Sequence, residues 1–296
     1  MTRLRHALIA LAVLTVGGCG PTASPSSSGA PIAVLGAENF YADLLTQIGG
    51  TRVTASSILS DPSADPHEYE ASPAAAKLVA DSKLVIVNGI GYDDFMEKLL
   101  SASTKPDRIV INAQDILGVK DDVNVHVWYD PGVMAKVAEA ATAALMKLDP
   151  DNAAYFSEQK AKYLAALKPL NDKIAALKAK YAGAPIAFTE NVAGYLTGAI
   201  GLKILTPPEF MEAIESGTDP APADVATERD LLTGRKVKAL LYNSQVTSPL
   251  TEQIRELAVG SNVPVVPVAE TIPRDFKTFQ EWQLAQLDDL ERALAK

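Results

Sequence analysis

Short runs of β-branched and apolar residues alternate with helical patterns along most of the chain, and this alternation limits the possible folds more than any other feature. Strand, helix and strand in succession form the unit of a parallel sheet, so α/β architecture is favoured over a β-sandwich or a helical bundle. The predicted strands are residues 32–35, 53–58, 84–88, 109–111, 186–188, 237–242 and 263–268. The predicted helices are residues 38–48, 73–80, 92–100, 131–148, 191–200, 222–232, 249–259 and 276–295.

Residues 149–181 separate two strand-bearing halves, because they have no strand pattern and are rich in Ala, Lys, Glu, Leu and Gln. This composition predicts one long helix, and about 30 residues at 1.5 Å each would reach roughly 45 Å. Pro169 should kink or split this helix, since its ring removes a backbone donor and clashes with the preceding turn. We predict that residues 149–182 link an N-terminal lobe, 32–148, to a C-terminal lobe, 183–296. Two consecutive helices of a single domain are the alternative.

The N-terminal residues have the pattern of an export signal, with a basic stretch at 2–6 and an apolar run at 7–16. That run is too short to cross a bilayer core of about 30 Å. Cys19, the only cysteine, follows it as in the lipobox of bacterial lipoproteins, so an internal disulfide or a cysteine metal cluster is excluded. We expect residues 1–18 to be removed, Cys19 to be lipidated and residues 19–31 to be a flexible tether. The expected location is extracytoplasmic, at the cell membrane; a stray cysteine in a cleaved peptide is the alternative.

The charge balance argues against nucleic acid as a partner. The chain has 27 Lys and Arg against 36 Asp and Glu, a formal net charge of −9, which would repel a phosphate backbone. A negative surface suits a cationic ligand, although many acidic proteins are acidic for solubility alone. The acidic segment 209–224 is expected to be a surface loop, with a turn at Asp219 and Pro220.

Four side chains are candidates for binding a metal ion. His67 and His126 are the only histidines beyond the signal, and each lies in a segment just ahead of a predicted helix. Imidazole is a common ligand of divalent metals. Glu190 and Glu270 each come just after a predicted strand, at the sheet edge where open α/β proteins bind ligands. Taken singly, each histidine could instead be structural, and each glutamate could be a carboxylate at a helix N-terminus.

No local motif for zinc, nucleotide phosphate or a serine nucleophile is present, since HExxH, CxxC, GxGxxG, the P-loop and GxSxG are all absent. Four features together nevertheless resemble the zinc/manganese solute-binding lipoproteins of bacterial ABC transporters. They are Asp-Pro-His-Glu-Tyr-Glu-Ala-Ser-Pro at 65–73, His-Val-Trp-Tyr-Asp-Pro at 126–131, Thr-Glu-Asn-Val-Ala-Gly-Tyr-Leu at 189–196, and the acid Glu270. The resemblance covers nearly the whole chain from Ile32 onward.

This resemblance implies two α/β lobes, each with a parallel sheet flanked by helices, joined by a long backbone helix. One divalent cation would lie in the cleft between the lobes. By analogy His67 and His126 are its ligands from the N-terminal lobe, and Glu190 and Glu270 those from the C-terminal lobe. The family usually has Asp where this chain has Glu270, and its zinc-dedicated members commonly have a third His and a His-rich loop that this chain lacks.

The implied function is the capture of Zn²⁺ or Mn²⁺, with Fe²⁺ as a further option, and its delivery to an ABC permease and ATPase for import. The protein would act as a monomer, with no catalytic residues and not as an enzyme. A zinc-dependent hydrolase and a surface adhesin on the same scaffold are the alternatives. Because metal binds neutral imidazole, the affinity should weaken as the pH falls through about 6.5.

Overall fold

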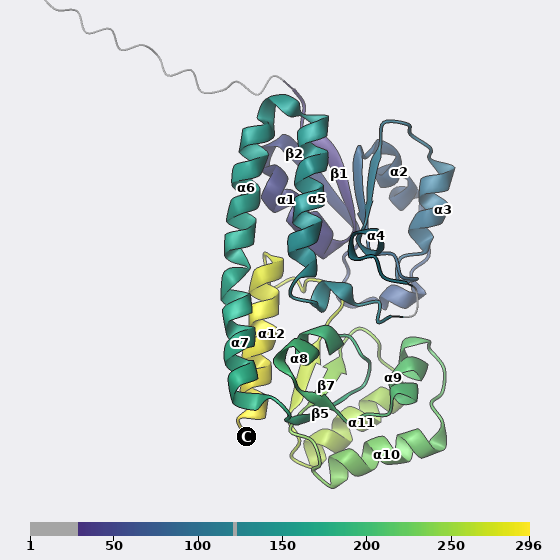
Figure 1. Ribbon diagram of the computed structural model, residues 1–296. Coiled ribbons are helices and arrows are strands. Elements are labelled where there is room, and N and C mark those ends of the chain that lie inside the picture. The colour runs from purple at the N-terminus through teal and green to yellow at the C-terminus, as the bar shows by residue number, and fades with distance from the viewer. Residues whose placement is uncertain (1–28, 121–122) are drawn as a thin grey trace, which may run out of the picture. The chain divides into compact units, whose positions relative to one another are not determined.

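The computed structural model describes residues 29–120 and 123–296, of which residues 31–296 form one compact unit. The predicted export signal and Cys19 lie outside the described residues, as does most of the predicted tether. Residues 31–296 contain two four-stranded sheets, both parallel and both flanked by helices (Figure 1). The predicted α/β class is therefore confirmed. None of the helices within the described ranges is both long and apolar enough to cross a membrane.

The first sheet has the strand order β2-β1-β3-β4. Its strands are β1 (Ile32–Glu38), β2 (Val53–Leu59), β3 (Leu84–Val87) and β4 (Ile109–Asn112). The accompanying helices are α1 (Asn39–Gly49), α2 (Pro73–Asp81), α3 (Phe95–Ala102), α4 (Ala113–Leu117) and α5 (Val133–Leu148). The chain runs from β1 to one side and then returns to the other, so β1 and β3 form the switch point at which such sheets bind ligands.

The second sheet repeats this order as β6-β5-β7-β8. Its strands are β5 (Pro185–Phe188), β6 (Lys203–Ile204), β7 (Leu240–Asn243) and β8 (Val265–Val268). The accompanying helices are α8 (Gly194–Ile200), α9 (Pro208–Glu215), α10 (Pro222–Thr233), α11 (Pro249–Gly260) and α12 (Phe279–Leu294). Here the switch point lies between β5 and β7, which are direct neighbours.

The expectation of a loop over 209–224 was wrong, because most of this segment belongs to helices α9 and α10. Phe210, Met211 and Ile214 are all buried, at the spacing of one helical face. Burial of this face stabilises a helix despite the acidic residues on its other side. Only the stretch between the two helices, which contains Asp219 and Pro220, remains irregular.

The long helix predicted between the two halves is divided at Leu167 into α6 (Ala153–Ala166) and α7 (Lys168–Tyr181). Pro169 lies in the first turn of α7, where the missing N–H costs least, so the predicted break at this proline is confirmed. Helix α6 contacts α1 and α5 beside the first sheet, whereas α7 contacts α8 and α12 beside the second (Figure 1). The two helices thus follow both sheets in turn.

Polar side chains on α1 also tie the first sheet's helices to the C-terminal segment. Asn39 exchanges two hydrogen bonds with the backbone of Ile272, at 3.0 and 2.8 Å. Four residues further along α1, Asp43 accepts a hydrogen bond at 2.9 Å from the backbone N–H of Phe279, the first residue of α12. This carboxylate satisfies one of the unpaired N–H groups of the helix N-terminus. Burial raises the pKa of Asp43 to about 6.

Tyr129 makes a second polar connection between the two halves. It lies in a 3₁₀ turn, Val127–Tyr129, and is buried. Its hydroxyl lies 2.7 Å from the backbone oxygen of Ala269 and 2.8 Å from Gln286 Oε1 on α12. Since Ala269 directly precedes Glu270, Tyr129 fixes the backbone beside one of the candidate metal ligands.

Replacing Tyr129 by phenylalanine should therefore destabilise the protein. The change removes a buried hydroxyl whose single proton lies between two buried oxygens. Leaving a buried polar group without its hydrogen-bond partner costs about 1–3 kcal/mol of the free energy of unfolding. Tyr163 is the matched control, because its hydroxyl is buried and no described residue bonds to it. Urea unfolding of the metal-free protein should show a loss for Tyr129→Phe and none for Tyr163→Phe; equal effects would contradict this account.

Candidate metal centre

His67 is held by a short, rigid turn after β2. Pro66 and His67 lie in the 3₁₀ helix Pro66–Glu68, and Asp65 caps it by accepting a hydrogen bond from the backbone N–H of His67 at 2.9 Å. The proline fixes φ at the first position of this turn. The side chain of His67 retains 21 % of its exposure, so His67 is the one candidate ligand that reaches the surface.

His126 is fully buried and is oriented by Asn124. Asn124 Oδ1 accepts hydrogen bonds from the backbone N–H of His126 at 2.9 Å and from its ring Nδ1 at 2.8 Å. The orientation of the Asn124 amide is fixed by its nitrogen, because Nδ2 donates to the backbone oxygen of Asn191 at 2.7 Å. The ring proton therefore lies on Nδ1, and Nε2 is left facing the candidate ligands of the C-terminal lobe.

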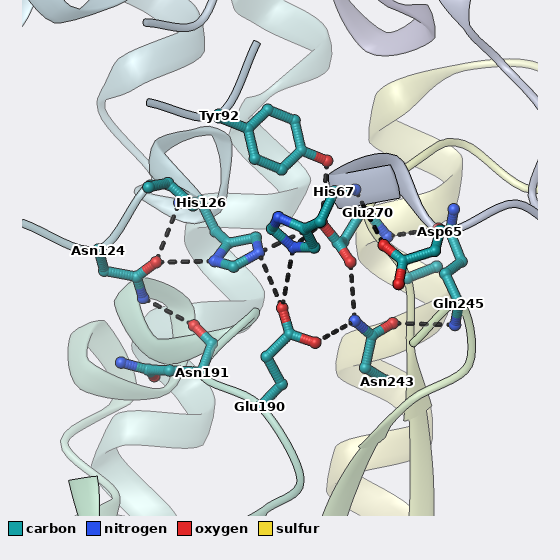
Figure 2. Close-up of polar contacts among 12 residues, drawn as sticks. Asp65, His67, Tyr92, Asn124, His126, Glu190, Asn191, Asn243, Gln245 and Glu270 are labelled. Carbon is teal, nitrogen blue, oxygen red and sulfur yellow. Dashed lines mark hydrogen bonds and ion pairs between the residues drawn. The ribbon is translucent and has the colours of Figure 1, made fainter. Parts of the chain in front are cut away.

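Glu190 and Glu270 follow β5 and β8 at the carboxyl edge of the second sheet, and both are fully buried. Glu190 Oε1 lies 3.3 Å from Nε2 of His67 and 3.5 Å from Nε2 of His126. Glu270 Oε2 lies 3.4 and 3.3 Å from the same two atoms. The four candidate ligand atoms all lie within 4.8 Å of one another. Figure 2 shows these side chains pointing toward one another.

The four nitrogen-to-oxygen separations, 3.3 to 3.5 Å, suit a shared ion. Two atoms that bind one ion at about 2.0–2.2 Å, with roughly 90–110° between the bonds, lie about 2.8–3.6 Å apart. The structure thus brings together all four residues singled out in the sequence, two from each half of the chain.

Two amide residues, one at the end of β7 and one just after it, complete the polar frame. Asn243 Nδ2 donates to Glu190 Oε2 at 2.6 Å and to Glu270 Oε1 at 2.7 Å. Gln245 Oε1 accepts the backbone N–H of Glu270 at 2.7 Å, and its Nε2 donates to the backbone oxygen of Ala64, just before the His67 turn. Gln245 therefore connects the backbone beside one candidate ligand to the loop that carries another.

Tyr92 donates a hydrogen bond from its hydroxyl to Glu270 Oε2 at 2.9 Å. It follows the turn Gly89-Ile90-Gly91, in which all three residues have positive φ. A Cβ on Gly89 would approach Asn112 Oδ1 to 2.5 Å, so this position needs glycine for both its φ and its space. The turn lies between β3 and α3.

Sequence reasoning did not identify Tyr92, Asn124, Asn243 and Gln245 as parts of the site. A usable signal existed for Asn243, which is the last residue of β7 and occupies the same sheet edge that marked Glu190 and Glu270. No comparable signal marked Tyr92 or Asn124, whose roles depend on side-chain contacts with distant parts of the chain.

The two carboxylates change the proton affinity of both histidines. Burial alone lowers the pKa of His67, but Glu190 and Glu270 outweigh it and raise its pKa to about 11. The same balance raises the pKa of His126 to about 9. Burial would raise the pKa of Glu270, but both imidazoles outweigh it and lower this pKa well below its usual range. Without a cation, the cluster therefore holds imidazole protons at neutral pH.

A family model described as "ZnuA: Zinc-uptake complex component A periplasmic" matches residues 34–293. The chain therefore belongs to this family, and the resemblance inferred from its motifs is confirmed.

Individual relatives agree with this assignment. The metal ABC transporter substrate-binding lipoprotein SsaB of Streptococcus sanguinis is 25 % identical over 281 residues, which covers 87 % of this chain and 86 % of SsaB. The manganese-binding lipoprotein MntA of Halalkalibacterium halodurans is 26 % identical over 171 residues, and this match spans only 57 % of MntA. Among solved structures, the periplasmic zinc binding protein TroA from Treponema pallidum has the same fold, with a TM-score of 0.75, 18 % identity and coverage of 90 % of this chain and 100 % of TroA.

The raised histidine pKa values predict that metal binding releases protons. Both imidazoles are protonated below about pH 9, so a bound ion has to displace up to two protons. The observed Kd should then rise by up to about a hundredfold for each unit by which the pH falls between 8 and 6. Unperturbed imidazoles would give such a rise only below their pKa of about 6.5. Calorimetry of Zn²⁺ binding in buffers of different ionisation enthalpy counts these protons. A Kd independent of pH would rule out displacement of imidazole protons.

Proposed function

We propose that this protein is the substrate-binding component of an ABC importer and that it captures one divalent transition-metal ion outside the cytoplasm. The observation that carries the proposal is the convergence of two imidazole nitrogens and two carboxylate oxygens on one small volume. Two borderline nitrogen donors with two hard oxygen donors suit Zn²⁺ or Mn²⁺. Relatives named for either metal agree with this range.

In this proposal His67 and His126 bind the ion through Nε2, and Glu190 and Glu270 bind it through Oε1 and Oε2. Each half of the chain supplies two ligands, so the ion is held fully only when both halves face it. A ligand shifts a conformational equilibrium by its differential affinity for the two states, and the ion would therefore favour the closed arrangement. The exposed edge of His67 gives the ion a route in from solvent.

Lipidation at Cys19 and removal of residues 1–18 would keep the protein at the outer surface of the cell membrane, next to its permease and ATPase. Both proposals rest on the sequence pattern of this chain, and the relatives SsaB and MntA are named as lipoproteins. A monomer is sufficient, because one chain supplies all four proposed ligands.

A carrier is favoured over a zinc hydrolase by the donor set itself. Catalytic zinc sites commonly keep three protein ligands and an open position for water, whereas here four protein atoms face one another. No feature of the described residues favours an adhesin over a carrier.

The first test measures metal binding by the chelator-stripped protein. We expect one ion per chain for the wild type, with a stabilisation of about 2.7 kcal/mol at a free metal concentration a hundred times the Kd. Removing a residue that only supports a metal ligand typically weakens metal affinity by about 10–100-fold. His67→Ala removes a proposed ligand itself, so its metal affinity should fall by more than this. Glu68→Ala, which removes an exposed carboxylate from the next position, is the matched control and should bind normally. Absence of bound Zn²⁺, Mn²⁺ and Fe²⁺ in the wild type would refute the proposal.

Import is tested in cells that lack the gene for this protein. Under metal limitation they should accumulate less of the cargo metal, and wild-type protein should restore accumulation, whereas His67→Ala at equal abundance should not. The Cys19→Ala variant should not be lipidated, so its processing and its share in the membrane fraction should differ from those of the wild type. Membrane fractionation measures this share. Unchanged metal content in the deletion strain would contradict a role in uptake.

A further inference from the structure

Asn243 places one hydrogen bond on each carboxylate of the cluster, and its orientation is fixed. The backbone N–H of Gln245 donates to Asn243 Oδ1 at 3.0 Å, so the amide oxygen is occupied and the amide nitrogen faces the acids. The two hydrogens of Nδ2 therefore serve Glu190 and Glu270 (Figure 2). Because an amide nitrogen only donates, the oxygens that it contacts act as acceptors.

The oxygens bound by Asn243 are not those that face the histidines. Asn243 contacts Glu190 Oε2 and Glu270 Oε1, whereas Glu190 Oε1 and Glu270 Oε2 are the atoms nearest the imidazoles. Each carboxylate thus presents one oxygen to the centre and has the other held by the amide. For both oxygens to bind an ion, the carboxylate would have to turn and leave the fully buried Asn243 without its acceptors, which is unfavourable for a buried polar group.

We infer that Asn243 determines metal specificity, by restricting Glu190 and Glu270 to one oxygen each and so favouring Zn²⁺ over Mn²⁺. This inference rests on the proposed function, in which these acids are ligands. With one oxygen from each acid the protein supplies four donors, the number that Zn²⁺ prefers in a tetrahedral site. With both oxygens it would supply six, which suits the octahedral, oxygen-rich coordination of Mn²⁺.

The test compares the Zn²⁺ and Mn²⁺ affinities of the full chain by chelator competition in wild type, Asn243→Ala and Gln245→Ala. Asn243→Ala frees the second oxygen of both acids, and we expect the preference for Zn²⁺ to fall by about ten- to a hundredfold. Gln245→Ala is the matched control. It loosens the backbone beside Glu270 and touches neither carboxylate, so it should weaken both metals alike and leave their ratio unchanged.

Co²⁺ absorption reports the coordination number directly. A variant whose fold is merely looser would not change this number in a defined direction. The wild type should give the intense visible bands of four-coordinate Co²⁺, and Asn243→Ala should give the weaker bands of five or six ligands. Six-coordinate Co²⁺ in the wild type overturns the inference, and so does a folded Asn243→Ala variant with an unchanged Zn²⁺ to Mn²⁺ ratio. If Asn243→Ala does not fold, the wild-type spectrum decides. Wild-type protein that binds none of the three ions would instead refute the proposed function itself.

Discussion

Glu190 and Glu270 face each other without access to solvent, and the elements around them are arranged to satisfy this pair of buried acids. A buried carboxylate is strongly unfavourable unless it is paired and hydrogen-bonded. Here two imidazoles face the pair, Asn243 donates to both acids, and Tyr92 donates to Glu270. These partners come from both halves of the chain, so satisfying the acids also aligns the two sheet edges.

The backbone supports this arrangement by repeating one strand order twice. In the second sheet β5, β7 and β8 are neighbours, and their carboxyl ends deliver Glu190, Asn243 and Glu270 to one place. The segment after β2 supplies His67, and the segment after α4 supplies His126. Contacts away from the centre, such as those of Asn39 and Tyr129, hold the halves together, so that alignment does not depend on the acids alone.

Much of this could be predicted from the sequence, because it depends on local patterns. The α/β class follows from alternating strands and helices, the break between α6 and α7 from Pro169, and the position of Glu190 and Glu270 from the sheet-edge rule. Segment 209–224 was misjudged because its charges were weighed above the buried face of α9. Asn243 was overlooked because a neutral amide at a strand end has many ordinary roles, and only its contacts with two distant acids distinguish it. That the four candidates act as ligands stays a prediction.

The protons held by the two imidazoles bear on how a permease could distinguish the metal-free carrier from the metal-bound one. With both imidazoles protonated, exchange of two protons for one divalent ion would leave the sum of charges at the cluster unchanged. A protein with a formal net charge of −9 would then present nearly the same electrostatic field in either state, and long-range attraction would not select the loaded form. Discrimination would fall to shape, and the partly exposed turn around His67 is the part of the cluster that a docking partner could touch.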